Sequence, residues 1–363
     1  MKIQDVINRI ETYAPLHFQE SYDNSGIQVG NSSMEVKGIL LTIDITEEVL
    51  EEAVIKGCNL VIAHHPLLFL SQKKITGSNY IQRCIIFAIK HDITIYASHT
   101  NMDKVRKGVS WKMAEKINLK RCKPLAIENE YRLKLVTFVP NKQTEQVANA
   151  LYKAGAGIIG NYSSCSYRSS GLGSFKASDK CHPFCGNINE YHIEPEDRLE
   201  VILDPQIKEK VIEALLETHP YECPAYDLYE SKESGECGLG CIGELDAPTD
   251  AMTFLKLIKK TFKTDSIKYT SLPNHPIKKI ALCGGAGIEL LPQAKEQNAD
   301  IFITGDVKYH QFFDADKQIV IADIGHYESE QFTKEIFYDV IYEKNANFVV
   351  QYSEIKTNPI KYL

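Results

Sequence analysis

The first part of the chain alternates short apolar runs with helical spacings, a pattern typical of parallel strands joined by helices. The runs 38–45 (GILLTIDI) and 59–63 (NLVIA) are almost wholly apolar, as in strands that helices cover on both faces. Between them, residues 46–56 predict a helix, and Thr46 stands where an N-cap is expected. The same pattern predicts an N-terminal helix around Val6, Ile7 and Ile10, helices at 81–90 and 109–117, and a strand at 93–97.

The pattern changes over residues 128–233, which predict a separate domain. Its strands and helices follow the order of a ferredoxin-like α+β module, with a Gly/Ser-rich stretch that ends at Gly173. The predicted elements are the strand 133–139, the helix 144–154, the strand 199–203 and the helix 206–218.

Strands and helices alternate again beyond residue 235. The predicted elements are the helices 251–262, 289–297 and 328–342 and the strands 279–283, 301–304 and 318–322. The expected fold class is therefore α/β. Residues 1–127 and 234–363 form one discontinuous α/β core, and residues 128–233 form an α+β domain inserted into it.

Composition and charge narrow the classes of function. The chain has 363 residues, 44% of them hydrophobic and 25% charged, values ordinary for a globular protein. A net charge of -7 disfavours binding to nucleic acid, so nucleic acid is not an expected partner. No apolar run approaches the ~18 residues of a membrane helix, and the N-terminus does not resemble a signal peptide. We expect a cytoplasmic protein without membrane association.

The ten cysteines stand at irregular spacings, which does not indicate a disulfide framework. Most are expected to be small buried residues. The closest pairs are Cys181 with Cys185 and Cys237 with Cys241, and neither has the two-residue spacing typical of a structural zinc site.

Candidate chemistry concentrates where the predicted strands end, the usual place for sites in open α/β sheets. His64 and His65 come directly after the strand 59–63 and before Pro66. Because adjacent residues on an extended backbone point in opposite directions, the pair fits two ions more easily than one shared ion. A hydrogen-bonded pair of structural histidines is the alternative.

Two further strand ends carry imidazoles and carboxylates. His99 and Asp103 follow the strand 93–97, although Asp103 alone is more typical of a helix cap. His326 and Glu330 are four residues apart on a predicted helix and share a face. Glu328 faces away from that pair and suits the role of a first-turn acid.

Three histidines and two carboxylates make a mixed nitrogen and oxygen set that suits zinc, manganese or iron. Five ligands leave two ions with open positions, and a bridging carboxylate would hold the ions close together. His310 follows another strand and is either a proton carrier beside the metals or a hydrogen-bond partner. The glycine cluster 283–287 (CGGAG) is either a phosphate site or a tight turn.

Six ordered motifs give the chain a resemblance to the Nif-three-like dinuclear metal protein family, also known as GTP cyclohydrolase 1 type 2 homologues. The motifs are 23–27 (DNSGI), 64–66 (HHP), 99–103 (HTNMD), 283–287 (CGGAG), 304–310 (TGDVKYH) and 325–330 (GHYESE). The resemblance covers essentially the whole chain. It implies that two divalent ions are bound by His64, His65, Asp103, His326 and Glu330, with Glu330 bridging.

The resemblance also implies an assembly and an inserted domain. The family forms a toroidal homohexamer with the metal centres facing an internal cavity. Residues 128–233 resemble the PII/CutA-like insert of the longer members.

Two functions follow as hypotheses. The first is a metal-dependent hydrolase acting on a small, nucleotide-like molecule, with GTP cyclohydrolase I chemistry as the precedent and His99 and His310 as candidate catalytic proton carriers. The second is a metal- or ligand-binding regulatory hexamer without turnover, because the PII/CutA-like fold is used for sensing.

Overall fold

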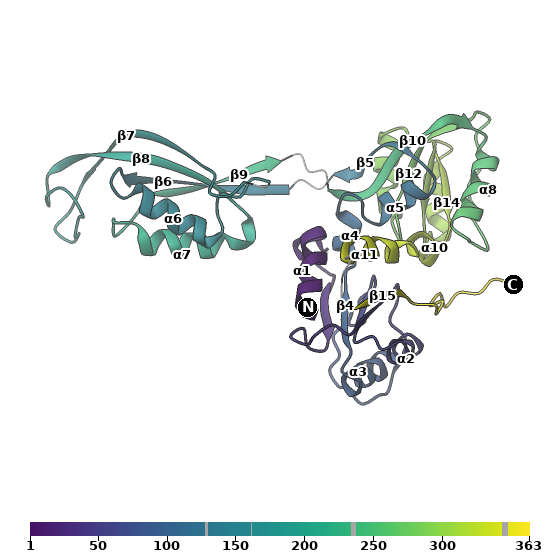
Figure 1. The fold of residues 1–363 in the computed structure, drawn as a ribbon. Helices are drawn as coiled ribbons and strands as arrows, with labels where there is room; N and C mark the ends of the chain where they lie inside the picture. Colours follow the sequence, from purple (N-terminus) through teal and green to yellow (C-terminus); the bar gives the residue numbers. More distant parts are fainter. Residues whose placement is uncertain (128–129, 161, 234–236, 343–347) are drawn as a thin grey trace. The chain divides into compact units, whose positions relative to one another are not determined.

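The chain folds into two units, one of them built from both ends of the sequence (Figure 1). Unit 1 comprises Met1–Glu128 and Glu236–Leu363, and unit 2 comprises Asn129–Gly235. The computed structural model describes residues 1–127, 130–160, 162–233, 237–342 and 348–363. The expected domain boundaries at 127/128 and 233/234 fall next to residues outside this described part and stay predictions.

The first sheet of unit 1 has the strand order β1-β4-β3-β2-β15. All neighbours pair in parallel except β1, which runs antiparallel to β4. The strands are β1 (Gly26–Val29), β2 (Gly38–Thr42), β3 (Leu60–Ala63), β4 (Thr94–Ala97) and β15 (Val349–Tyr352).

Helices cover both faces of this sheet, so its central strands are fully buried and mostly apolar. Ile39 and Leu41 pack with α1 and α11, whereas Leu40 between them packs with α2 and α3. The helices are α1 (Ile3–Tyr13), α2 (Glu47–Ile55), α3 (Tyr80–Lys90) and α11 (Thr333–Ile341), and a 3-10 turn η1 spans Leu16–Phe18. The predicted cap is confirmed, because the Thr46 side chain accepts a hydrogen bond from the Val49 backbone N–H.

The second sheet of unit 1 has the order β11-β14-β13-β12-β10-β5. β12, β13 and β14 are parallel, and the other strands pair antiparallel. The strands are β5 (Lys120–Ile127), β10 (Gly238–Thr249), β11 (Lys268–Tyr269), β12 (Ile277–Leu282), β13 (Ile301–Thr304) and β14 (Val320–Asp323). The expected α/β core therefore contains two sheets.

Helices also cover the second sheet on two sides, so its parallel strands are buried. α5 (Val109–Lys116) and α8 (Ala251–Thr261) pack on one face, and α9 (Leu291–Glu296) packs on the other with the 3-10 turns η3 (Ile288–Leu290) and η4 (Tyr309–Ala315). No helix among the described residues combines the length and apolar content of a membrane span.

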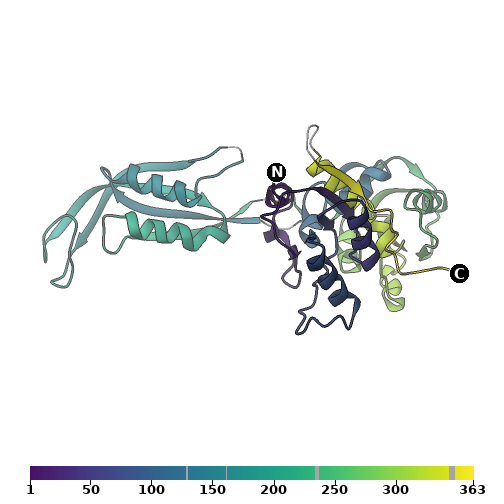
Figure 2. The same cartoon turned by 60° about the horizontal axis from the view of Figure 1, so that its bottom comes forward.

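Unit 2 is a single antiparallel sheet with two helices on one face (Figures 1 and 2). Its sheet order is β7-β8-β6-β9, with α6 after β6 and α7 after β8. This is the split βαβ connection order of ferredoxin-like modules. The elements are β6 (Glu130–Pro140), α6 (Thr144–Ala154), β7 (Ser166–Lys176), β8 (Tyr191–Leu203), the 3-10 turn η2 (Pro205–Ile207), α7 (Lys208–Thr218) and β9 (Tyr226–Glu233).

The structure defines the Gly/Ser-rich stretch and corrects one predicted helix. Much of the stretch before Gly173 lies in β7, an edge strand whose residues all pair with β8. The predicted helix 328–342 is two helices, α10 (His326–Glu330) and α11, and its first turn starts earlier than predicted. Gly325, at φ +95°, provides the sharp turn that starts α10 directly after β14.

Candidate metal centre

The ends of two sheets of unit 1 bring the candidate ligands together. His64 and His65 follow β3, and both backbone N–H groups donate to the carbonyl of Ile43 beyond β2. Asp103 lies on α4 (Thr100–Lys104), directly after β4. His326 and Glu330 lie on α10, at the end of β14 in the second sheet.

Glu330 is common to two groups of possible ligands. One group is His64, Asp103 and Glu330, and the other is His65, His326 and Glu330. Glu330 Oε1 lies 3.6 Å from His64 Nε2, whereas Oε2 lies 3.0 Å from His65 Nε2 and 3.2 Å from His326 Nε2. His64 Nε2 is also 3.7 Å from Asp103 Oδ1. Each carboxylate oxygen of Glu330 therefore faces one group, the arrangement of a bridging ligand.

Hydrogen-bond acceptors around the cluster orient the imidazole rings of four histidines. Each Nδ1 lies within hydrogen-bond distance of an acceptor that has no proton to give, so Nδ1 is the donor and Nε2 of the neutral ring is left as a lone pair. The pairs are His64 with the Ser98 carbonyl at 3.0 Å, His65 with Asp44 at 2.7 Å, His99 with Asp23 at 2.8 Å and His326 with Asp306 at 2.8 Å.

Several buried polar atoms of this cluster have no hydrogen-bond partner. They are His64 Nε2, Asp103 Oδ1 and Glu330 Oε2. In addition, His65 Nε2 and His326 Nε2 face each other at 3.2 Å, which places two lone pairs together when both rings are neutral. Leaving a buried polar atom unpaired costs about 1–3 kcal/mol. Divalent cations would satisfy all of these atoms at once, so the residues fit a metal centre.

The charges of the cluster lead to the same conclusion. Burial opposes ionisation of Glu330, but His64, His65 and His326 outweigh burial and hold the pKa of Glu330 well below its usual value. Burial raises the pKa of Asp103, and the charge of Glu330 raises it further. Burial lowers the pKa of His65, but Glu330 and Asp44 outweigh that effect and raise it to about 10. Without metal, the buried carboxylates are therefore balanced by protons on the histidines.

The glycine cluster gives Glu330 its space. A Cβ added at Gly285, where φ is +64°, would lie 2.3 Å from Glu330 Oε1. The backbone N–H groups of this turn already donate to side-chain hydroxyls, Gly284 to Ser110, Gly285 to Ser329 and Gly287 to Thr304. These contacts support the tight turn rather than the phosphate site.

The structure does not bring every candidate into the centre. His99 adjoins it and forms a further group of possible ligands with His64 and His65, with its ring centroid 5.3 Å from that of His64 and 5.4 Å from that of His65. His310 is exposed on η4 and stacks near Phe313. Glu328 is buried and accepts a hydrogen bond from Asn358, away from its neighbour Glu330.

Sequence reasoning missed the residues that orient the histidines. Asp23 lies in the 23–27 motif, but the motif alone does not assign it a role. Asp44 and Asp306 each stand two residues beyond a strand end, after β2 and β13, at the same edge as the ligands. The signal that could have found both is the one that found the ligands, a polar residue just past a buried strand.

Comparisons with known proteins agree over the full length. A model of the family described as "Duf34/NIF3 (NGG1p interacting factor 3)" matches residues 1–359. Proteins named "GTP cyclohydrolase 1 type 2 homolog" are similar, with 37% identity in Halalkalibacterium halodurans, over 99% of this chain and 98% of the relative. The Staphylococcus epidermidis protein of that name is 34% identical over 100% of both chains.

Solved structures match as well. A Bacillus cereus protein described as related to NIF3 has a TM-score of 0.77 and 34% identity, over 100% of this chain and 99% of that chain. A Staphylococcus aureus protein has a TM-score of 0.81 and 29% identity over the same shares. With a family model that spans nearly every residue and relatives above 30% identity over their full length, the chain belongs to the DUF34/NIF3 family.

Proposed function

We propose that unit 1 binds two divalent metal ions, zinc, manganese or iron. His64 and Asp103 would hold one ion, His65 and His326 the other, and Glu330 would bridge them. The observation that carries this proposal is that three buried atoms without hydrogen-bond partners, His64 Nε2, Asp103 Oδ1 and Glu330 Oε2, belong to one cluster of possible ligands. Mixed imidazole and carboxylate donors suit these three metals.

We further propose that the centre hydrolyses a nucleotide-like substrate. Ions in such a centre supply Lewis acidity toward the group being hydrolysed. His99 is the proton carrier, because Asp23 holds its Nδ1 and leaves Nε2 for a proton at the centre. His65 and His326 are 23% and 31% exposed whereas His64 is fully buried, so a substrate would approach from the His65 side.

A cavity beside His99 supports a substrate that contains an aromatic base. It has a volume of about 600 Å³, and Tyr22, Asp23 and Phe69 are among its lining residues. The ring of Phe69 lies 6.2 Å from that of His99 and 6.4 Å from that of Tyr22, and both aromatic side chains are exposed. Exposed aromatic rings are platforms on which bases stack, at about 1–3 kcal/mol per base.

The test combines metal analysis with a substrate screen. Metal content is measured by mass spectrometry for the wild type, His65→Ala, Glu330→Gln and the control Glu328→Gln, which changes a neighbouring buried carboxylate that faces away. We expect the control to hold as many ions as the wild type, and Glu330→Gln to hold at least one ion fewer. The loaded proteins are then assayed against GTP, other nucleotides and phosphoesters.

The variants also separate the roles within the hydrolase. We expect His99→Asn to keep its metal and lose activity by about 10²–10⁴-fold, as for a lost proton carrier. We expect Phe69→Ala to raise KM more than it lowers kcat. Fully loaded wild type that turns over no member of the panel would contradict the hydrolase and leave the metal site standing.

The alternative function is a regulatory assembly without turnover. The βαββαβ order of unit 2 favours it, since we propose that this unit is a PII/CutA-like module, a fold used for sensing. It predicts that binding to a partner changes with metal. A set of captured partners that is the same for wild type and His65→Ala, with and without chelator, would contradict it.

We also propose that the protein works as a cytoplasmic, toroidal homohexamer. Light scattering then gives a mass six times 41.0 kDa. A monomer or dimer at micromolar concentration would contradict this assembly.

A further inference from the structure

Three side chains with different donor atoms meet on unit 2, and none of them belongs to the centre in unit 1. They are Cys185, His192 and Glu194, and their sulfur, nitrogen and oxygen donors all lie within 4.8 Å of one another. His192 Nε2 lies 2.8 Å from Glu194 Oε2. Among the ligand groups found in the described part of the chain, this is the one that contains sulfur.

Strand geometry places two of the three donors. His192 and Glu194 are two residues apart on β8, so their side chains leave the same face of the sheet. The alternate residues Leu199, Val201 and Leu203 pack against the helices, which puts His192 and Glu194 on the opposite face. Both side chains are only about a quarter exposed, at 28% and 25%.

The loop between β7 and β8 folds back to supply the third donor. Gly186 has φ +76°, and a Cβ added there would lie 2.7 Å from Cγ of His192, so the loop backbone rests on the imidazole ring. This close approach brings Cys185, the preceding residue, beside His192. On the other side, the ring of Phe175 lies 5.4 Å from the ring of His192 and restricts it further.

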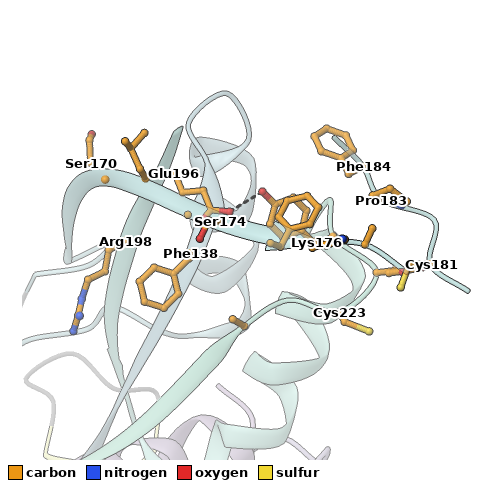
Figure 3. Close-up of a pocket in the computed structure, with 18 of the residues that line it drawn as sticks. Phe138, Ser170, Ser174, Lys176, Cys181, Pro183, Phe184, Glu196, Arg198 and Cys223 are labelled. Carbon is orange, nitrogen blue, oxygen red and sulfur yellow. Dashed lines mark hydrogen bonds between the residues drawn. The ribbon is translucent and has the colours of Figure 1, made fainter. Parts of the chain in front are cut away.

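A cavity lined by residues of the loop and of the sheet lies near the three donors. Its volume is about 660 Å³, and Figure 3 shows Cys181, Pro183 and Phe184 along one end, with Arg198 at the other. Tyr221 joins the cavity to the donors, because its hydroxyl donates to Glu196 at 2.6 Å and lies 3.8 Å from Cys185 Sγ.

We propose that Cys185, His192 and Glu194 bind a single zinc ion that ties the loop 177–190 to β8. Thiolate, imidazole and carboxylate are all zinc ligands, and three protein ligands leave a fourth position for water. The thiolate and the carboxylate together neutralise the two charges of the ion. The site shares no residue with the centre in unit 1. In this proposal Cys185 binds the ion together with His192 and Glu194, and Cys181 is not a ligand.

Cobalt(II) is the probe that separates this site from the first, because only a thiolate ligand gives a sulfur-to-cobalt charge-transfer band in the near ultraviolet. The full-length protein, metal-free and with thiols reduced, is titrated with Co²⁺. We expect a band that saturates at one ion per chain, is lost in Cys185→Ser and His192→Asn, and persists in Glu330→Gln. Cys181→Ser and Cys223→Ser are matched controls at nearby cysteines and should keep the band.

A zinc competition with a chromophoric chelator gives an independent readout. Cys185→Ser should hold one zinc ion fewer than the wild type at the same chelator concentration, with an unchanged circular dichroism spectrum. No charge-transfer band in the wild type, or a band that survives in Cys185→Ser, would overturn the proposal. Both results are independent of whether unit 1 is a hydrolase.

Discussion

At the residue scale, the centre in unit 1 depends on the carboxylates that hydrogen-bond to the histidines as much as on the histidines themselves. Asp44, Asp306 and Asp23 each accept a hydrogen bond from the Nδ1–H of a histidine ring. This orients the Nε2 atom of that ring toward the cluster. Such partners typically contribute 10–100-fold to metal affinity. A structure that kept all five ligands but lost these carboxylates would therefore bind metal weakly.

The first prediction concerns Asp44. Asp44→Ala removes the acceptor from His65 Nδ1, so the ring can rotate or change tautomer, and we expect the affinity of the metal site that contains His65 to fall about 10–100-fold. Isothermal titration calorimetry with Zn²⁺ measures it. Asp246→Ala, an exposed aspartate on β10, is the matched control. Equal affinities in the two variants would show that Asp44 does not orient the ligand.

The second prediction concerns pH. In the metal-free protein, burial lowers the pKa of His326, but Glu330 and Asp306 outweigh it and raise the pKa to about 11; the pKa of His65 is about 10. Because the unfolded chain titrates near 6.5, this stabilisation is complete below pH 6.5 and is lost as pH rises toward 10–11. We expect the free energy of unfolding to fall between pH 7 and 10.

Urea unfolding in chelator measures this slope, with His326→Asn as the comparison because the mutant lacks one of the two protons. The fall should be shallower in His326→Asn than in the wild type. With metal bound, Nε2 of each ligand histidine carries no proton, so metal affinity should instead increase with pH. Parallel slopes in the two metal-free proteins would contradict the prediction.

At the element scale, the ligands are positioned by the turns between the ends of strands and the starts of the helices that follow them. α10 is only five residues long, yet it carries two ligands, because Gly325 turns the chain directly from β14 into the helix. The turn after β12 then leaves room for the Glu330 carboxylate above Gly285. Both glycines contribute by leaving steric room and by adopting positive φ, and neither contributes a functional group.

The third prediction uses this close approach. Gly285→Ala should cost about 1–2 kcal/mol in backbone strain and also push Glu330 out of place, so we expect both ions to be lost. Gly57→Ala is a closely matched control, because its φ of +68° imposes the same strain while its added Cβ meets nothing within 4 Å. Metal analysis and thermal unfolding of both variants separate strain from ligand displacement. Equal metal content would contradict the prediction.

A comparison of the observed strands and helices with the predicted ones shows which elements can be recognised from the sequence. Buried strands such as β3 and β13 and capped helices such as α2 were predicted closely, because an apolar run or a helical spacing is a local signal. The strands β5 and β10 were missed, since antiparallel strands with one exposed face need their partners to be recognised. The break between α10 and α11 was also missed.

The candidate site follows the same rule. Polar residues at strand ends identified the cluster of His64, His65, Asp103, His326 and Glu330, because parallel strands bring their carboxyl ends to one edge. The pairing of Asp44 with His65 and of Asp306 with His326 could not be predicted. Those contacts depend on the order of strands in a sheet, and the order is set by long-range packing rather than by local sequence.

At the scale of the whole molecule, unit 2 enters and leaves unit 1 through two strands that are already partners. β5 and β10 pair antiparallel, with Ile127 opposite Gly238. The two residues of unit 1 between which unit 2 is inserted are therefore adjacent, as they would be in a β-hairpin closed by a short turn. Unit 1 does not need the insert to close its sheet.

The fourth prediction is that unit 1 folds without unit 2. Replacing residues 128–237 by an Asn-Gly turn should close β5 and β10 into a hairpin. We expect the shortened protein to keep two ions and any hydrolase activity, and to lose the sulfur-to-cobalt band. Metal analysis and cobalt spectra measure both. A shortened protein that unfolds or loses its ions would show that unit 2 supports the centre.

The order of ligands along the chain has a consequence for synthesis. His64, His65 and Asp103 leave the ribosome early, but His326 and Glu330 follow more than 200 residues later. At 5–20 residues per second that interval is roughly 10–40 s, during which unit 2 is complete and can fold. Only chains translated past Glu330 can therefore hold the proposed bridged pair of ions in unit 1.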